Sequence, residues 1–324
     1  MSSSTSSFKS ELKVILVVVA VVGLFEAGAR VRDHYSPKGD ESLLRGFARD
    51  ARELKAEPGI RVILMGNSLT RGGYNLEVFQ KELQAAGGGP ISVRNCGMHG
   101  SMMVEWYYVF KQNFIGANAP DVLVVSLSPD GGEDGNPHAF RISWLSYEVG
   151  WRDVPELAAT DLRSFDLSTQ FMLARLSSAM AHQWNLRVDL VYTHIPHFWE
   201  GMQTLNGRVN LAAINRAKSV RGAPPPAPTY ALLKRFMALI AANHTRLLVV
   251  AMPVREHYEI DPGLPRALEA GGMAFMDCRD IQGLTPDKFA DGWHLTDEGT
   301  TVFSKYMARH LPGRLNEIVG RKRE

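Results

Sequence analysis

A serine at the end of an apolar run is the first residue in the chain whose position could support chemistry. In the stretch "IRVILMGNSLTRGG", Ser68 lies two residues after Gly66, and a helical pattern starts soon after it. One interpretation is structural, because Asn67 or Ser68 can cap a helix by accepting hydrogen bonds from free backbone N–H groups. The other is catalytic, and it requires a base elsewhere in the chain, because a serine hydroxyl alone is a weak nucleophile.

A candidate base lies near the other end of the chain, in "FADGWHLTDEGTTVF". Asp291 and His294 are three residues apart, immediately before a predicted helix that begins near Thr296. In a turn of that spacing, a carboxylate can accept a hydrogen bond from the imidazole Nδ1–H and leave Nε2 free for a serine hydroxyl. We therefore predict that Ser68 is a nucleophile, that His294 is its general base, and that Asp291 orients the imidazole.

Short apolar runs and helical patterns alternate between these two motifs. The runs begin near residues 60, 91, 121, 246 and 273, and they are apolar throughout, as in strands covered on both faces. This alternation predicts an α/β fold with a parallel sheet and right-handed crossovers. Ligands gather outside the carboxyl ends of the strands in such sheets, and Ser68 follows the first strand.

These motifs, in their order and separation, resemble those of the SGNH, or GDSL-type, hydrolase superfamily. The resemblance covers most of residues 60–311 outside an insertion. In the family's first motif, Gly-Asp-Ser-Leu-Thr-x-Gly, only the aspartate differs here, because Asn67 replaces it; the last motif, Asp-x-x-His, is met by Asp291 and His294. The resemblance implies a three-layer sandwich with a central, mostly parallel five-stranded sheet of flavodoxin-like type. It also implies serine-dependent ester chemistry without a cofactor or a metal.

Two further family motifs supply donors to the oxyanion. "NCGMHG" contains Asn95 and Gly100, so the resemblance implies an oxyanion hole made by the backbone N–H groups of Ser68 and Gly100. The remaining motif departs from the family, because Asp130 stands where an Asn side chain usually donates. A carboxylate cannot donate unless it is protonated, so either Asp130 points away or the hole uses only the two N–H groups.

Residues beside these motifs are candidates for substrate binding. Arg71 could meet an anionic group of a substrate, although an arginine in such a place often only covers a surface. His99 lies next to Gly100 and could line the pocket, or it could be a structural histidine. The substrate-binding candidates are Asn67, Arg71 and His99.

Composition excludes several other classes of function. The 324 residues are 45% hydrophobic and carry a net charge of +2, which fits a folded domain and shows no nucleic-acid footprint. Cys96 and Cys278 lie in no Cys/His cluster, so neither a zinc site nor a disulfide framework is predicted. His194 and His197 could suggest a metal pair, but no third ligand accompanies them.

The N-terminus predicts a membrane helix. Leu12–Ala29 is long enough for a short span of ~18 residues, and Val14–Phe25 contains no charge. Ala27-Gly28-Ala29 resembles a signal-peptide cleavage site, so cleavage remains an alternative to an uncleaved anchor. More basic residues follow the segment than precede it, yet long domains translocate largely regardless of charge. We expect a single-pass anchor with an extracytoplasmic, periplasmic domain.

The predicted organisation follows from these segments. A short tail precedes the membrane helix, a polar connector follows it, and an aromatic-rich insertion or cap interrupts the main domain before a basic tail. The boundaries are 1–11 for the tail, 12–29 for the transmembrane anchor, 30–58 for the connector, 59–314 for the SGNH-like domain, 131–228 for the insertion, and 315–324 for the basic tail.

The sequence leaves three functions open. The first is an esterase that acts on O-acyl (acetyl) groups of a cell-envelope glycan, as the resemblance to membrane-anchored family members implies. The second is a polysaccharide O-acetyltransferase that uses the same three residues. The third is a non-catalytic glycan-binding or assembly protein, which Asn67 and Asp130 keep open. The expected partners are an acylated carbohydrate or other ester and the membrane, with no nucleic acid and no identified protein partner.

Overall fold

A computed structural model describes residues 4–35, 40–86, 90–128, 141–182, 195, 197 and 229–320. The chain divides into two compact units. We call Met1–Pro37 with Thr169–Ala227 the N-terminal unit, and Lys38–Ser168 with Pro228–Glu324 the sheet unit. Each is described by itself.

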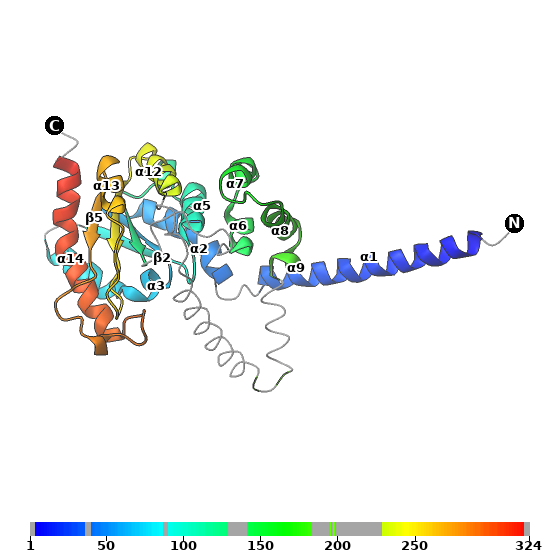
Figure 1. Ribbon diagram of the computed structural model, residues 1–324, viewed down its shortest axis with the longest axis horizontal. Helices are drawn as coiled ribbons and strands as arrows, with labels where there is room; N and C mark the ends of the chain where they lie inside the picture. The colour runs from blue at the N-terminus through cyan, green and yellow to red at the C-terminus, as the bar shows by residue number, and fades with distance from the viewer. Residues whose placement is uncertain are drawn as a thin grey trace, which may run out of the picture. The chain divides into compact units, whose positions relative to one another are not determined.

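Five parallel strands form the centre of the sheet unit (Figure 1). Their order is β2-β1-β3-β4-β5, and every neighbouring pair is parallel. The α/β fold predicted from the sequence is therefore confirmed. The order in which strands are added reverses after β2, because β3 lies on the other side of β1, and this puts the topological switch point at the carboxyl ends of β1 and β3. The strands are β1 (Ile60–Gly66), β2 (Ile91–Gly97), β3 (Val122–Leu127), β4 (Arg246–Ala251) and β5 (Ala274–Asp277).

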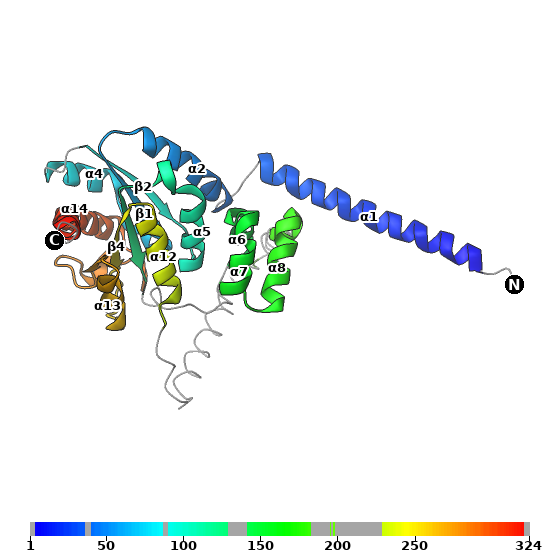
Figure 2. The ribbon, with the colours of Figure 1, turned by 90° about the horizontal axis from the view of Figure 1, so that it is seen from above.

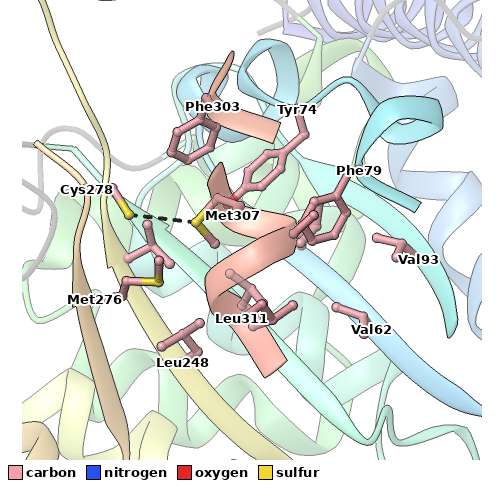
Figure 3. Packing of buried hydrophobic residues seen from close by; sticks show 14 of the residues in the cluster. Val62, Tyr74, Phe79, Val93, Leu248, Met276, Cys278, Phe303, Met307 and Leu311 are labelled. Atoms are coloured by element: carbon pink, nitrogen blue, oxygen red, sulfur yellow. Dashed lines mark hydrogen bonds between the residues drawn. The ribbon is translucent and has the colours of Figure 1, made fainter. Parts of the chain in front are cut away.

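Helices cover both faces of the sheet, which confirms the three-layer arrangement. The helices α4 (Leu76–Ala85) and α14 (Asp297–Gly320) pack on one face (Figure 3). The helices α5 (Met103–Asn113) and α12 (Ala231–Ala242) lie across the other (Figure 2). Successive strand residues point to opposite faces, so a strand that is covered on both sides carries apolar side chains toward both. The first face buries, among others, Val62, Leu64, Phe79, Val124, Leu248, Phe303, Met307 and Leu311.

The strand register aligns the loops that follow the central strands. Gly66 at the end of β1 pairs with Gly97 at the end of β2 and with Ser126 near the end of β3. The loops after these strands therefore open at one edge of the sheet. The sequence analysis predicted that Ser68 lies at this edge.

The predicted polar connector contains an amphipathic helix, α2 (Asp40–Ala56). Leu44, Phe47, Ala51 and Leu54 are buried on one side of it. They follow each other at intervals of three and four residues, so a single helical stripe faces the core. The Phe47 ring lies 6.4 Å from that of Phe114 at the end of α5. Most of the segment between residue 35 and β1 is thus part of the sheet unit.

The described part of the predicted insertion is helical. Residues 141–168 belong to the sheet unit, where Tyr107 of α5 donates to Glu156 (2.7 Å) and Lys111 pairs with the same carboxylate. Apart from residues 195 and 197, positions 183–228 lie outside the described residues. The helices are α6 (Ile142–Glu148), α7 (Val154–Thr160), α8 (Phe165–Leu176) and α9 (Ser178–Ala181).

The N-terminal unit contains α1 (Ser4–Tyr35). Within the described ranges it is the one helix long and apolar enough to cross a membrane, over Ser10–Tyr35, and a signal sequence would pass the same test. Its large apolar side chains from Val14 to Phe25 are exposed all round. A helix that is apolar on every side and packed against no core has the character of a membrane-facing segment.

Candidate active site

The turn after β1 gives Asn67 and Ser68 different tasks. Ser68 is the first residue of α3 (Ser68–Gly73), and Asn67 is its N-cap. The Asn67 side-chain oxygen accepts a hydrogen bond from Leu69 N at 3.0 Å. Because Asn67 caps the helix, the Ser68 hydroxyl is left for another partner. The structural interpretation of this motif therefore applies to Asn67.

Gly66 allows this turn to form against the neighbouring strand. A Cβ atom at this position would lie 2.0 Å from the hydroxyl of Thr70 and 2.8 Å from the carbonyl oxygen of Ser126. Both distances are far below van der Waals contact, and the second partner is backbone. Only glycine therefore lets the end of β1 approach both β3 and the first turn of α3.

The partner of the Ser68 hydroxyl is His294, from the loop before α14. The His294 Nε2 atom lies 2.9 Å from Ser68 Oγ, and its Nδ1 atom lies 2.8 Å from an Asp291 carboxylate oxygen. The structure thus joins three predicted residues in one chain of hydrogen bonds. Since a carboxylate only accepts, the Nδ1–H donates to Asp291, and the neutral ring then accepts from Ser68 through Nε2.

Local backbone bonds hold the loop that carries Asp291 and His294. The other oxygen of the Asp291 carboxylate accepts from Trp293 N at 2.6 Å and from His294 N at 2.7 Å. The carbonyl oxygen of His294 accepts from Ala290 N at 2.8 Å. These bonds close a short turn, so the Asp-x-x-His spacing itself brings the carboxylate back to the imidazole.

The Asp291 carboxyl is held in its charged form. Partial burial acts to raise its pKa, but hydrogen bonds from the backbone and ring of His294 and from Trp293 N outweigh it and lower the pKa to about 2. Asp291 is therefore an anion at any neutral pH. A fixed negative charge beside Nδ1 stabilises an imidazolium whenever Nε2 takes up a proton.

Asn95 ties the end of β2 to α3. Its side-chain nitrogen donates to the carbonyl oxygen of Thr70 at 3.0 Å, and its side-chain oxygen accepts from Gly97 N at 2.9 Å. In addition, Met98 N donates to the carbonyl oxygen of Gly66 at 2.8 Å. The predicted Asn95 thus positions the loop that leads to Gly100.

The two predicted oxyanion donors follow two adjacent strands, β1 and β2, at the same edge of the sheet. Ser68 N begins α3, and Gly100 lies in the turn after β2 with a positive φ of 64°. Within the part of the chain that the structure describes, neither N–H donates to an acceptor. Both groups are therefore without a protein acceptor among the described residues.

The remaining predicted residues have less defined positions. Arg71 is exposed and directs its guanidinium to the carbonyl oxygen of Asn95 at 3.4 Å. His99 is exposed beside Gly100. Asp130 lies outside the described residues, so its relation to the oxyanion stays a prediction.

Among the residues that the structure describes, few side chains are placed as metal ligands. No group of three or more His, Cys, Asp or Glu side chains there could hold a metal ion. His194 lies outside the described residues, whereas His197 is described with a positive φ of 57°. Cys96 and Cys278 are buried free thiols whose pKa values are raised by burial; Cys278 contacts Met307 in the core (Figure 3).

Sequence reasoning missed the residues that shape the space around Ser68. A small hollow that is partly open to solvent is lined by Ser68 and His294 together with Met252, Trp293 and Leu295. Two signals in the sequence could have found them: Met252 directly follows β4 at the same sheet edge, and Trp293 lies within the Asp-x-x-His motif. The space beside Ser68 is small and has both polar and apolar lining.

The sequence analysis also missed Arg141 and Glu105, which lie near Gly100. A Cβ atom on Gly100 would come within 2.7 Å of the Arg141 guanidinium, which also stacks on the Trp144 ring at 4.5 Å. The buried Glu105 carboxylate accepts from Met102 N (2.9 Å) and from Arg141 N (2.8 Å). Burial raises the pKa of Glu105 to about 7. Glu105 thus links the Gly100 loop to the start of α6, across a distance that no sequence pattern reports.

Comparisons with known proteins give distant structural likenesses. No protein-family model and no curated protein matches the chain. It is similar in structure to a lipase/acylhydrolase from Enterococcus faecalis, with 12% identity and a TM-score of 0.39 over 79% of this chain and 96% of that one. An acetylxylan esterase from Geobacillus stearothermophilus has 14% identity and a TM-score of 0.38, over 82% and 96% of the two chains. A GDSL-like lipase from Bacteroides thetaiotaomicron has 14% identity and a TM-score of 0.37, over 83% and 98%.

Proposed function

We propose that this protein is a serine-dependent ester hydrolase of the SGNH type. The observation that carries the proposal is the unbroken chain of hydrogen bonds from Ser68 Oγ through the His294 ring to the Asp291 carboxylate, at 2.9 and 2.8 Å. A nucleophile within reach of a base, with the base oriented by a third group, is the arrangement that activates a hydroxyl. A structural cap needs no such base.

The chemistry follows from this geometry. Ser68 Oγ attacks the ester carbonyl carbon while its proton passes to His294 Nε2, and the Asp291 anion stabilises the imidazolium. The backbone N–H groups of Ser68 and Gly100 bind the oxyanion. When the intermediate collapses, the carbon–oxygen bond to the alcohol breaks, and the alcohol leaves with the proton from Nε2. Water then attacks the acyl-enzyme by the same route, which releases the acid and restores Ser68.

We assign the substrate as O-acyl, and specifically acetyl, groups of a cell-envelope glycan. The small hollow beside Ser68, which Met252 and Trp293 help to line, supports a short acyl group. The apolar α1 helix supports an enzyme held at a membrane. With the sheet unit on the periplasmic side, the triad faces the glycan that it deacylates.

Transfer to a sugar hydroxyl is the alternative outcome of the same triad. The acyl-enzyme is then resolved by an acceptor, so the protein is a polysaccharide O-acetyltransferase. The exposed Arg71, His99 and Gly100 beside the site support room for a bulky acceptor. A non-catalytic glycan-binding or assembly protein is the third alternative, and it predicts an unreactive Ser68.

Covalent labelling tests the proposal directly. The full-length protein is treated with a fluorophosphonate and its intact mass is measured, in parallel with hydrolysis of an aryl acetate. We expect one adduct, located on Ser68, which is absent in Ser68→Ala and strongly slowed in His294→Ala. The matched control is Ser164→Ala, because the Ser164 hydroxyl caps α8 by accepting from Leu167 N at 3.1 Å. Loss of that cap costs about 1 kcal/mol of stability and leaves labelling unchanged.

Three outcomes separate the functions. Labelling with aryl acetate hydrolysis supports the esterase. Labelling with slow hydrolysis that accelerates when a glycan acceptor is added supports the transferase. A folded protein that takes up no probe of any size and hydrolyses no aryl acetate contradicts both enzymes and supports the binding protein.

A further inference from the structure

The uncharged run of α1 ends at Glu26, and this acidic residue has several partners. The Glu26 carboxylate accepts from the Ser177 hydroxyl at 2.7 Å, from Ser178 N at 2.9 Å and from Ala179 N at 3.2 Å. It also pairs with Arg30, one turn further along α1, at 2.6 Å. The charge that terminates the apolar run is thus bound to the corner between α8 and α9.

The contact continues along the last turns of α1. Arg30 donates to the carbonyl oxygen of Leu176 at 3.0 Å, at the end of α8. The buried Asp33 accepts from Ser178 Oγ and lies 3.2 Å from Nε2 of the buried His182. Residues 26–33 of α1 therefore form a polar, partly buried interface with residues 176–182. Figure 1 shows α9 against this end of α1.

The same corner carries exposed apolar side chains. Leu173, Leu176 and Met180 are 44%, 59% and 37% exposed, and Phe25 is 61% exposed one residue before Glu26. Because Glu26 and Arg30 bond to residues 176–179, these side chains lie at the level where the apolar surface of α1 ends. Exposed apolar side chains of α8 and α9 therefore lie near the end of the apolar run of α1.

The length of α1 decides where a membrane meets this corner. From Leu12 to Phe25 the helix rises only about 21 Å at 1.5 Å per residue, whereas the hydrocarbon core of a bilayer is about 30 Å thick. A span of about 20 residues that starts at Leu12 ends near Val31. Glu26 lies within the last two turns of that span, so the corner bonded to it falls next to the boundary between the acyl chains and the headgroups.

We propose that the corner formed by residues 173–182, which we call the α8–α9 corner, is a membrane-interface element that inserts Leu173, Leu176 and Met180 into the headgroup–acyl boundary of a phospholipid bilayer. Glu26 holds the corner against α1, and its bonds to Arg30 and to the backbone of α9 satisfy a charge that is costly at that depth. Apolar side chains beside arginine groups are typical of elements that lie in the interface. The membrane contact of this protein is then larger than a single helix.

Site-directed fluorescence measures this contact in the full-length protein. Leu176→Cys is labelled with an environment-sensitive thiol probe and reconstituted in vesicles of phosphatidylcholine with a minor fraction of phosphatidylglycerol. The native Cys96 and Cys278 are both buried, so they do not compete for the probe. The matched control is Lys305→Cys on the exposed side of α14. We expect lipids spin-labelled high on the acyl chain to quench the probe at 176 several-fold more than the probe at 305, and aqueous iodide to show the reverse.

Equal quenching of both sites by iodide would overturn the proposal. Glu26→Ala in the Leu176→Cys background tests the tether, with Glu11→Ala as the control for a change of charge on α1. We expect Glu26→Ala to raise iodide quenching at 176, and an unchanged value would contradict the role given to Glu26. Thermal unfolding of each variant in detergent distinguishes a moved corner from an unfolded protein. This measurement does not depend on the chemistry of Ser68.

Discussion

The division of labour between two adjacent residues defines the site at the residue scale. The side chain of Asn67 caps α3, and the next residue, Ser68, presents its hydroxyl to His294 instead. The aspartate that the family motif has at position 67 would accept the same backbone hydrogen bond, so the Asn in this chain keeps the cap. The departure of Asn67 from the family motif is therefore compatible with a working nucleophile.

The ionisation of Asp291 leads to a prediction about pH. Because its pKa is lowered to about 2, the carboxylate orients His294 unchanged throughout the neutral range. We expect Asp291→Asn to slow aryl acetate hydrolysis by up to roughly 10⁴-fold, since the imidazole loses its orienting anion. The slowing should be present throughout the range from about pH 5 to pH 9, because Asp291 of the wild type stays ionised across it. A variant that hydrolyses the ester as fast as the wild type at any pH in that range would contradict this assignment.

Glu105 leads to a prediction about stability. Burial raises its pKa from 4.5 to about 7, so the folded state favours the protonated carboxyl. The stabilisation of the folded state that comes from protonated Glu105 is fully present below pH 4.5, and it is lost as the pH rises through about 7. Glu105→Gln cannot ionise, so we expect the free energy of unfolding of the wild type to fall relative to that of the variant between pH 5 and pH 8, by up to about 3 kcal/mol.

Denaturant unfolding at both pH values provides the measurement. The exposed Glu256→Gln is the control, and its difference from the wild type should not follow this course. A wild-type free energy that stays parallel to that of Glu105→Gln would show that Glu105 is charged in the folded protein at both pH values.

At the scale of elements, the packing of α2 gives the clearest prediction. Phe47 is fully buried and packs near Phe114, although it lies in a segment that the sequence suggested was a polar connector. We expect Phe47→Ala to lower the free energy of unfolding by about 3–5 kcal/mol, through lost burial and the cavity left behind. Arg49→Ala, on the exposed side of the same helix, should change it by less than about 0.5 kcal/mol. Equal effects of the two variants would mean that α2 does not pack on the sheet unit.

The position of Ser68 also depends on how the secondary-structure elements pack. Its turn begins at the end of β1, and β2 meets α3 through the Asn95 side chain. His294 comes from the loop before α14, and α14 packs on the same face of the sheet as α4. Two strands and one helix thus set a distance of 2.9 Å between residues that lie 226 positions apart. Rigid elements, rather than the loops alone, hold the nucleophile and its base.

The whole molecule combines an apolar helix with a separate compact unit that holds Ser68, Asp291 and His294. We expect the full-length protein to stay in membranes washed with alkaline carbonate. Its intact mass should include residues 1–35, because Ala27, Gly28 and Ala29 lie within a continuous helix and Ala29 is buried. A mature chain that begins near residue 30 would show instead that α1 is a cleaved signal.

Orientation is measured on the same preparation. Protease added to intact spheroplasts should digest the sheet unit if it faces the periplasm, with a cytoplasmic protein as the control for lysis. Complete protection in spheroplasts, followed by digestion after lysis, would place the unit in the cytoplasm.

Local physics explains what the sequence determined by itself. Short runs rich in Val, Ile and Leu specify strands that are covered on both faces, so the α/β class and all five strands could be read from the chain. The bond from His294 to Asp291 spans three residues of one turn, which places it within reach of spacing arguments. The uncharged run of α1 was equally legible, since length and composition alone describe such a helix.

Only the tertiary structure decided which distant residues meet. The contact of Ser68 with His294, the wall made by Met252, and the approach of Arg141 to Gly100 each join segments far apart in the chain. The burial of α2 and the partners of Glu26 were likewise decided only by the tertiary structure. Periodicity reports which side of an element is apolar, but it does not report which element covers that side. Close packing of rigid elements selects those partners, and this information arises only when the whole chain folds.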